Sequence, residues 1–370
     1  MYITSATKES ILEAILSLRL QKSETVFIGV AEGVELNLHD LIQTLNQRQI
    51  PFFGGLFPAV IGDGEKQDLG VIIKRIATHH KPIVVEDLAN ANVHSIQRKI
   101  QSKSIEHSAF CFVDGLADSI TSFLRNFQSA MDLPLKVMGG GAGSLSLKRK
   151  PCLFTNEGLF ENAAIIVFSS LEMEIGVRHG WHPISDLMLV TKSYKNVIEE
   201  LNWLPAFEVY KHFVSKVERI MVEKENFFGI AKHYPLALCR EVGEDLVRDP
   251  IMVGKHDELI CVGEVPQNAA LRLLNGNEES LVQAASHAAR ASLRQKGTPA
   301  DSLVIDCISR ALFLEGKYKE EISAISKVLE QTVKSDYIEG VLTLGEIASH
   351  GDGLIDFYNK TIVIGTRYDK

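Results

Sequence analysis

The order of apolar and polar residues predicts one structural unit that occurs three times along the chain. Each copy begins with an apolar run of strand length and continues with apolar residues at i, i+3, i+4 and i+7, which is the pattern of an amphipathic helix. A second short strand then leads to a glycine. The first strands are Thr25–Ala31, Ala109–Val113 and Leu303–Ile308. The glycines that close the second strands, where we expect a tight turn, are Gly54, Gly139 and Gly340.

After each of these glycines, an extended segment leads through a turn into a third apolar strand. These third strands are Gly70–Ile76, Ala163–Ser169 and Thr361–Gly365. The helix makes the first strand pair parallel and the hairpin makes the next pair antiparallel, so the sheets are mixed. Runs such as AAIIVFS have no polar alternation, so we expect both of their faces to be covered. The sequence predicts an α/β fold of mixed sheets built from repeated strand-helix-strand-hairpin units, and an α/β/β/α layering is one economical arrangement.

Elements of another kind separate the second copy from the third. A helix is predicted to begin at Leu204-Pro205, because proline is favoured in a first helical turn, and another at the N-cap Asn277. The charged stretch Glu223–Glu225 is a reasonable place to divide the chain. The expected parts are an N-terminal helix at 1–24, a first domain at 25–224 and a second domain at 225–370.

Composition and charge restrict the class of protein. The chain has 370 residues, 45% hydrophobic and 23% charged, which is globular composition with room for two or more domains. Its net charge of −8 argues against a general affinity for nucleic acid or anionic lipid. No apolar run approaches the roughly 18 residues of a membrane helix, and no secretory signal is visible. Five scattered cysteines without a CxxC pair indicate a reduced compartment. We therefore expect a cytoplasmic protein.

Gly139-Gly140-Gly141-Ala142-Gly143 is the segment most similar to a phosphate-binding loop. It does not fit the dinucleotide fingerprint, because Ser144 stands at the third glycine and a turn and strand follow instead of a helix. No Gly-Lys-Ser/Thr follows, so a P-loop is excluded as well. Two interpretations stay open: a backbone bend in which a side chain would clash, or close approach of backbone N–H groups to a bound anion or carboxylate.

A second group of polar residues follows the strands of the third copy. Cys307 and Arg310 lie at the end of its first strand, and Gly345-Glu346 lies beyond its glycine. Ligands collect at the carboxyl ends of strands in such units, and the planar fork of an arginine suits a carboxylate. Alternatively, Cys307 is plain core and Arg310 with Glu346 is a structural ion pair.

Two further features give weaker indications of a functional site. His179-Gly180-Trp181-His182-Pro183 contains two histidines, but its glycine and proline disfavour a helix and no third metal ligand is near. A loop tryptophan between histidines could line a pocket instead. A Cys307 nucleophile with a spatially adjacent base stays open as an enzyme hypothesis, and it requires a lowered thiol pKa.

Taken together, the chain resembles the FIST family, named for F-box and intracellular signal-transduction proteins. In the first domain the resemblance is carried by Gly139–Gly143, Phe154…Gly158, His179-Gly180-Trp181…Pro183, Val190-Thr191 and Leu201…Leu204-Pro205-Ala206. In the second domain it is carried by Cys307-x-x-Arg310, Gly340…Gly345-Glu346-Ile347 and Asn359-Lys360-Thr361. Each motif is weak alone, but their order and spacing cover nearly the whole chain.

The resemblance implies a sensory, ligand-binding protein rather than an established enzyme. Small ligands such as amino acids have been proposed for bacterial members, and a subset resembles haem proteins that sense nitric oxide and regulate a partner histidine kinase. The sequence shows no kinase, methyl-accepting, GGDEF or DNA-binding segment, so we expect a separate signalling partner in a two-component system. The expected ligand-binding residues are Gly139, Gly140, Gly141, Cys307, Arg310, Gly345 and Glu346.

The first glycine segment departs from the family pattern, and the departure bears on the ligand. It reads Gly54-Gly55-Leu56-Phe57-Pro58-Ala59, where many relatives carry a hydroxyl-bearing Gly-x-Ser-Thr-like turn. If this turn faces the ligand, the binding pocket is apolar and favours haem over an amino acid. The alternative is that the turn is part of the hydrophobic core. The axial ligand of a haem stays open among 12 histidines and Cys307. We expect a small ligand between the two domains, with a ligand-free scaffold as an alternative, and a homo-oligomer is compatible with the sequence.

Overall fold

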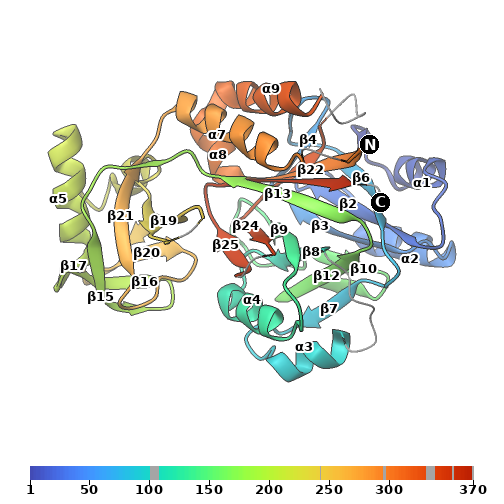
Figure 1. Ribbon diagram of the computed structural model, residues 1–370, viewed down its shortest axis with the longest axis horizontal. Helices are drawn as coiled ribbons and strands as arrows, with labels where there is room; N and C mark the ends of the chain where they lie inside the picture. The colour runs from blue at the N-terminus through green and yellow to red at the C-terminus, as the bar shows by residue number, and fades with distance from the viewer. Residues whose placement is uncertain (101–107, 242, 295–296, 331–337, 352–353, 369–370) are drawn as a thin grey trace.

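The molecule consists of a three-sheet core and an attached β-barrel (Figure 1). The computed structural model describes residues 1–100, 108–241, 243–294, 297–330, 338–351 and 354–368. Strand β13 (Glu172–Arg178) leaves the core for the barrel, and helix α7 (Glu278–Ala291) brings the chain back to it. The barrel is therefore an insertion between two parts of the core.

Three mixed sheets of six strands form the core. The first sheet has the order β1 (Tyr2–Ile3), β6 (Val71–Ala77), β2 (Glu24–Ala31), β3 (Phe52–Phe57), β10 (Leu153–Thr155) and β11 (Gly158–Phe160). The second has the order β25 (Asp356–Tyr358), β24 (Glu346–His350), β9 (Lys136–Ala142), β8 (Ser108–Asp114), β12 (Ala163–Ser169) and β7 (Ile83–Glu86). The third has the order β13, β26 (Ile362–Tyr368), β22 (Pro299–Cys307), β23 (Gly340–Thr343), β4 (Ala59–Gly62) and β5 (Glu65–Gln67).

The three repeated units exchange their hairpins in a cycle. Within each unit the first two strands are parallel, and the last strand returns antiparallel to the first: β6 to β2, β12 to β8 and β26 to β22. The hairpin between them leaves for another sheet. Strand β4 pairs with β23, β10 pairs with β3, and β24 pairs with β9. Each unit thus completes the sheet of another, so no unit has a complete sheet by itself.

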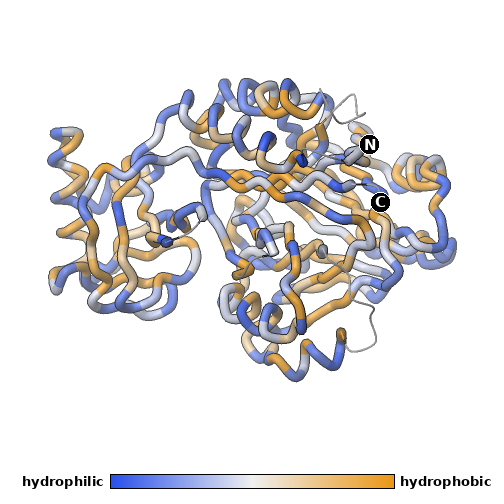
Figure 2. The backbone as a smooth tube through the Cα atoms, viewed as in Figure 1, coloured by the Kyte–Doolittle hydropathy of each residue, from blue (hydrophilic) through white to orange (hydrophobic). Residues whose placement is uncertain are grey.

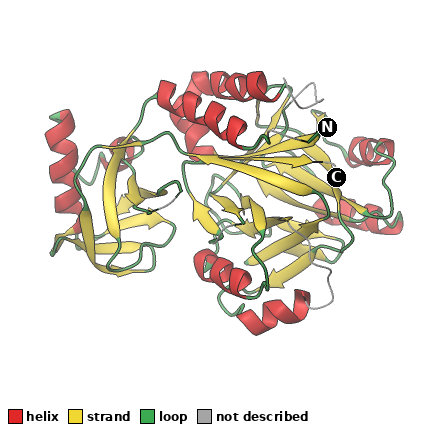
Figure 3. Cartoon of the chain, viewed as in Figure 1, coloured by secondary structure: helices red, strands yellow, loops and turns green. Residues whose placement is uncertain are grey.

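Helices cover the outer face of each sheet, and the inner faces meet in one common core (Figure 3). The first sheet is covered by α1 (Lys8–Ser17) and α2 (Leu38–Gln47), and the second by α3 (Val93–Ile100) and α4 (Ile120–Ser129). The third is covered by α7, α8 (Ile308–Leu314) and α9 (Tyr318–Leu329), with a 3-10 turn at Glu315–Lys317 between the last two. Apolar colour accordingly runs along the strands and the inward helix faces (Figure 2).

Aromatic side chains join the inner faces of the first and second sheets. The rings of Phe27 and Phe112 stack with their centroids 4.9 Å apart, and Phe57 packs edge-on against Phe112 at 5.7 Å. Phe57 belongs to β3 and is fully buried. The segment Gly54–Phe57, for which both a pocket turn and plain core were open, is therefore strand and core.

The three repeated glycines stand at equivalent positions inside strands, not at turns as expected from the sequence. Gly54, Gly139 and Gly340 pair in parallel register with Ile28, Cys111 and Val304. A Cβ built on each glycine would lie 2.1, 1.8 and 2.3 Å from the carbonyl oxygen of that partner. Such a distance is far below contact, so the neighbouring backbone itself excludes any side chain there.

The barrel is closed by pairing between its first and last strands. Its strands, in order around the ring, are β21 (Ala270–Asn275), β15 (Met188–Tyr194), β16 (Val197–Leu201), β20 (Leu259–Val262), β19 (Leu246–Val253) and β18 (Leu236–Leu238). The short strands β14 (His182–Pro183) and β17 (Leu204–Pro205) pair with β21 and β16. Helices α5 (Ala206–Glu218) and α6 (Phe227–Ala231) accompany the barrel, with α5 at its far side from the core (Figure 1).

The structure confirms the predicted α/β class with mixed sheets and places strands and helices where the repeated pattern predicts them. The Asn277 cap is confirmed, because its side chain accepts a hydrogen bond from the Ser280 N–H in a capping box. The layering differs from the economical arrangement: three sheets, each with its own helices, surround one core.

Candidate functional site

A cleft of about 190 Å³ lies between the core and the barrel. The core contributes the segment 115–121, which leads from β8 into the start of α4, together with Phe357. The barrel contributes the β15–β16 hairpin residues Lys195 and Asn196 and the segment 261–264, which comprises the end of β20 and the two residues after it. Because both structural units supply walls, a ligand in this cleft would contact both at once.

Charges of both signs line the cleft. Lys195 contributes an exposed ammonium group, whereas Asp118 and Glu264 contribute carboxylates. Asp118 is bound by Arg149 at 2.7 Å, so its charge is partly compensated. The Asn196 side chain donates a hydrogen bond to the Cys261 carbonyl at 2.9 Å, which fixes the hairpin against β20. A small molecule with separate positive and negative groups would match this lining.

The buried side chain of Arg248 connects the two walls of the cleft. This fully buried side chain of β19 donates to the Glu264 carbonyl at 2.8 Å and to the Phe357 carbonyl at 3.1 Å. It therefore holds one residue from each wall of the cleft. Burial lowers the pKa of Arg248 to about 10, which keeps the guanidinium charged at neutral pH.

Two further ion pairs attach the barrel to the core. Arg240 binds both oxygens of Asp356, one of them at 2.7 Å, and the Lys360 ammonium lies 3.2 Å from the Asp249 carboxylate. Burial raises the pKa of Asp249, while the adjacent ammonium opposes that shift. Apolar contacts join the two units as well, because Ala237, Val247 and Leu274 of the barrel share a hydrophobic cluster with Leu281 and Val304 of the core.

The structure brings the predicted glycines and Gly345-Glu346 together, but behind the wall of the cleft. The N–H of Gly141 donates to the Gly345 carbonyl at 2.8 Å, and Glu346 pairs with Gly140 in the β9–β24 register. Gly345 has φ +94°, and a Cβ there would lie 2.3 Å from the Phe357 ring. The glycines are buried in β9 and let β24 and the Phe357 ring approach closely.

Cys307 and Glu346 form a buried pair beside these glycines. Glu346 has zero exposure, and its carboxyl is within hydrogen-bond distance of Thr343 Oγ1 (3.0 Å), the Thr361 N–H (3.2 Å) and the Cys307 thiol. Burial raises the pKa of Glu346 to about 8, against the opposing effect of these donors. Burial also raises the pKa of Cys307 well above its ordinary value. Such a thiol is protonated at neutral pH, which is the opposite of an activated nucleophile.

The sequence left open an ion pair between Arg310 and Glu346. In the structure Arg310 instead belongs to a neighbouring cluster and pairs with Glu321. Its guanidinium binds both oxygens of Glu321 at 3.1 and 2.8 Å and lies 3.3 Å from Asp306. It also donates to the carbonyls of His179 and Leu281. All of its hydrogen-bonding capacity is used within the fold, so it has none left for a ligand.

The histidine pair does not form a metal site. His179 Nδ1 accepts from the Trp181 N–H at 2.9 Å, and His179 Nε2 lies 3.2 Å from Glu244 of the barrel. Burial lowers the pKa of His179 to about 4, so the ring is neutral. His182 is exposed on β14. Across the described ranges, no group of three or more His, Cys, Asp or Glu side chains could hold a metal ion.

Two protein-family models match the chain. Residues 60–204 match the FIST N domain and residues 206–349 match the FIST C domain. The chain belongs to the FIST family. The boundary between the two FIST matches falls in the barrel, at Pro205, the last residue of β17. FIST domains are associated with signal transduction. No curated protein matches the chain.

Sequence reasoning missed the residues that line the cleft of this FIST protein. Lys195, Glu264 and Arg248 carry no motif, and they come from strands and loops of the barrel, which was not predicted. Lys195 has φ +53° at the tip of a hairpin, but only the structure shows this. Among the described residues, no helix is long and apolar enough to cross a membrane.

A haem does not fit the residues of the cleft. Cofactor-sized ligands occupy sites of about 300–1,000 Å³, larger than this cleft. Burial raises the pKa of Cys261, the thiol in its wall, to about 12, whereas a haem thiolate ligand must be deprotonated. A groove of about 960 Å³ between α7 and α9 is large enough, but neither His nor Cys is among its lining residues.

Proposed function

We propose that this FIST protein is a sensor that binds a free small metabolite of amino-acid size in the core–barrel cleft. The observation that carries the proposal is the lining of the cleft, which comes from both structural units and offers Lys195 opposite in charge to Asp118 and Glu264. An apolar cavity of about 150 Å³ holds a benzene molecule. A cleft of about 190 Å³ therefore suits a molecule of about six to ten non-hydrogen atoms.

The proposed role is binding rather than catalysis. Burial raises the pKa of Cys307 and of Cys261, the thiol that lines the cleft, and both shifts support this role. We further propose that the ligand state passes to a separate signalling protein, for which the family resemblance suggests a histidine kinase. The ligand would act by changing how the barrel sits on the core, because it would contact both.

Thermal unfolding with a panel of amino acids and related zwitterions tests the ligand. At about 100 times its dissociation constant, a ligand stabilises the folded state by about 2.7 kcal/mol. With an unfolding entropy of about 2.1 cal/mol/K per residue, a chain of this size should gain about 3 °C in Tm. One compound or a small chemical class is expected to produce this shift.

Two variants connect the shift to the cleft. Lys195→Gln and Glu264→Gln should each lower the affinity for the compound about tenfold or more, because each removes a charge that faces the ligand. Lys192→Gln is the matched control, since Lys192 lies on the same hairpin but pairs with Glu199. A panel without any shift contradicts the proposal. A strong Soret band in protein from haem-supplemented cells contradicts it as well.

A further inference from the structure

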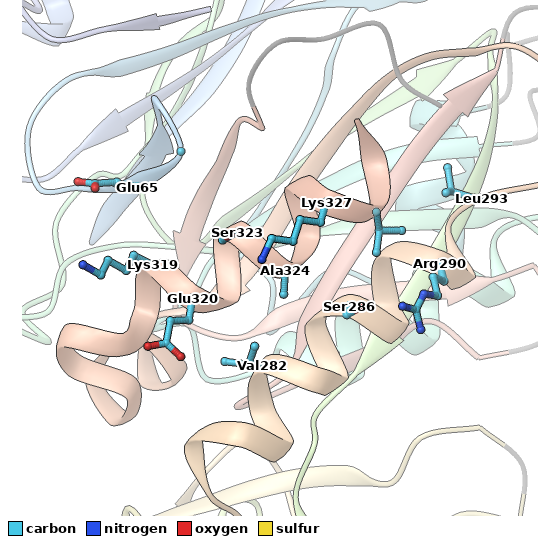
Figure 4. A pocket seen from close by; sticks show the side chains of 12 residues that line it. Glu65, Val282, Ser286, Arg290, Leu293, Lys319, Glu320, Ser323, Ala324 and Lys327 are labelled. Atoms are coloured by element: carbon cyan, nitrogen blue, oxygen red, sulfur yellow. The ribbon is translucent and has the colours of Figure 1, made fainter. Parts of the chain in front are cut away.

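A groove separate from the ligand cleft lies on the outer surface of the third sheet. Helices α7 and α9 enclose a groove of about 960 Å³, and the tip of the β4–β5 hairpin at Gly64-Glu65 closes one end (Figure 4). The helices have 14 and 12 residues, which corresponds to about 21 and 18 Å at 1.5 Å per residue. The groove is therefore long and open enough for three to four turns of another helix.

The floor of the groove consists of small and apolar side chains. Val282 and Ser286 come from α7, and Ala324 and Val328 come from α9. Short side chains at such a seam let another backbone approach closely, and the apolar ones gain from being covered. This is the lining expected of a groove that receives the apolar face of an amphipathic helix.

The rim of the groove carries three positively charged side chains. Arg290, Lys319 and Lys327 are exposed, and within the described residues none of them has an ion pair or a side-chain hydrogen bond. Neighbouring cations differ, since Lys317 pairs with Glu278 and Arg294 pairs with Glu172 and Glu174.

Arg290 lies on α7 beside Leu293, and Lys327 lies on the opposite wall, on α9, with its ammonium group pointing toward Ser323 (Figure 4). The two lining carboxylates, Glu65 and Glu320, lie at the opposite end with Lys319 (Figure 4). An incoming segment with carboxylates would therefore be held at the Arg290 end. This local positive charge contrasts with the net charge of −8 of the whole chain.

One wall of the groove is mechanically attached to the barrel. Arg310 donates to the Leu281 carbonyl in the first turn of α7, and to the carbonyls of His179 and Lys360. His179 leads into the barrel, and the Lys360 ammonium pairs with Asp249 of β19. One buried cation thus joins the start of α7 to two segments that hold the barrel.

From these observations we infer that the α7–α9 groove is the docking surface for a separate signalling protein, which inserts an acidic amphipathic helix. The inference rests on the proposed sensor function and names the surface that its output uses. The apolar face of the helix covers Val282, Ala324 and Val328, and its carboxylates bind Arg290 and Lys327. Movement of the barrel reaches the groove through Arg310 and α7.

Photo-crosslinking in the full chain tests this surface. Benzoylphenylalanine replaces Ser323 in the groove, and in a control chain it replaces the exposed Gln43 on α2. After irradiation in cells of the natural host, mass spectrometry identifies the crosslinked segment. The expected result is one protein whose contact segment is helical in pattern, apolar on one face and acidic. A basic or extended contact segment, a second copy of this chain, equal crosslinking from Gln43, or no crosslink overturns the inference.

Charge reversal adds a quantitative test with a synthetic peptide of the identified contact segment. The Arg290→Glu/Lys327→Glu variant should bind the fluorescein-labelled peptide at least about tenfold more weakly, measured by fluorescence anisotropy. Arg48→Glu/Lys148→Glu is the charge-matched control, since both residues are exposed and lie outside the groove. Equal affinity in both variants overturns the inference.

The outcome separates this inference from the sensor proposal. The groove variant keeps the ligand-induced rise in Tm if the cleft senses a metabolite, because Arg290 and Lys327 do not line the cleft. A ligand shift without an acidic helix in the groove refutes the docking surface alone. A crosslinked acidic helix without any ligand shift refutes metabolite sensing alone.

Discussion

Replacing Glu346 by Gln isolates the effect of one buried carboxyl group on stability. Burial raises the pKa of this group to about 8, so it carries its proton in the folded protein at pH 7. The hydrogen bonds agree with a protonated group. Thr343 Oγ1 lies 3.0 Å from a Glu346 oxygen and 3.2 Å from the Asp306 carbonyl, yet a hydroxyl has only one proton to donate. A carboxyl O–H supplies the second proton.

The direction of the pH effect follows from proton linkage. An unfolded Glu346 ionises near its ordinary pKa of 4.5, whereas the folded one keeps its proton up to about pH 8. Between these values the folded state binds more protons, so stability falls as pH rises by about 1.4 kcal/mol per unit. This contribution is fully present below pH 4.5 and lost by pH 8. From pH 5.0 to 7.5 the loss from this residue is about 3 kcal/mol.

Glutamine retains the shape and the hydrogen bonds without the ionisation. Its amide N–H₂ can donate to Thr343 Oγ1 and its oxygen can accept from the Thr361 N–H. We therefore expect Glu346→Gln to be within about 1 kcal/mol of the wild type at pH 5.0. At pH 7.5 it should be more stable by about 3 kcal/mol.

Urea unfolding at the two pH values, followed by fluorescence of the buried Trp181, measures the difference. Comparing two proteins cancels the titration of all other groups. Glu321→Gln serves as the control: its carboxylate is bound by Arg310 at both oxygens, so that variant should lose stability at both pH values. If the difference between Glu346→Gln and wild type is the same at pH 5.0 and 7.5, the carboxyl is ionised in the fold and the reasoning fails.

Three further predictions concern the core. Arg310→Met should cost about 3–5 kcal/mol by leaving Glu321 and Asp306 buried without their cation, whereas exposed Lys317→Met should change denaturation midpoints little. Gly139→Ala should cost at least about 3 kcal/mol because of the Cys111 carbonyl, whereas Gly229→Ala, with no atom within 4 Å, should be neutral or stabilising in thermal melts. Iodoacetamide at pH 7.5 should modify Cys239 first, the one cysteine that is not buried, and rapid modification of Cys307 in peptide mass maps would revive the nucleophile hypothesis.

The repeated units could be predicted from sequence because their patterns are local. Apolar runs such as Ala163–Ser169 and helical spacing such as that of α2 record burial residue by residue, and the structure places strand and helix there. The hairpin exchange leaves no such record. Strand β4 has the same apolar pattern whether it pairs within its own unit or with β23, so the pattern does not identify its partner.

The candidate site was harder for a related reason. The family resemblance and the positions of the strand ends identified Cys307, Arg310 and Glu346 as candidate residues. The sequence did not identify Glu321 as the partner of Arg310. Glu321 and Glu346 offer the same carboxylate, and only the packing of α9 on α8 brings Glu321 to the guanidinium. Lys195 and Glu264 are brought to one wall by the hydrogen bond from the Val265 N–H to the Lys195 carbonyl, and surface charges of this kind carry no sequence pattern of their own.

The third unit differs from the other two in the chemistry of equivalent positions. One set of equivalent positions lies in the first strand of each unit, two residues after the residue that pairs with the repeated glycine. These positions are occupied by Val30, Val113 and Asp306. A second set lies in the hairpin strands, at the residue that pairs with the position after each repeated glycine. These residues are Val60 in the first unit, Leu153 in the second and Glu346 in the third. Two units fill these positions with hydrocarbon, so the fold does not require acids there, and burying acids carries a desolvation cost. The third unit accepts that cost where Arg310 holds the segments that connect the barrel. The repeated fold therefore does not account for this buried polar cluster, whose cation Arg310 joins the start of α7 to the segments that lead into the barrel.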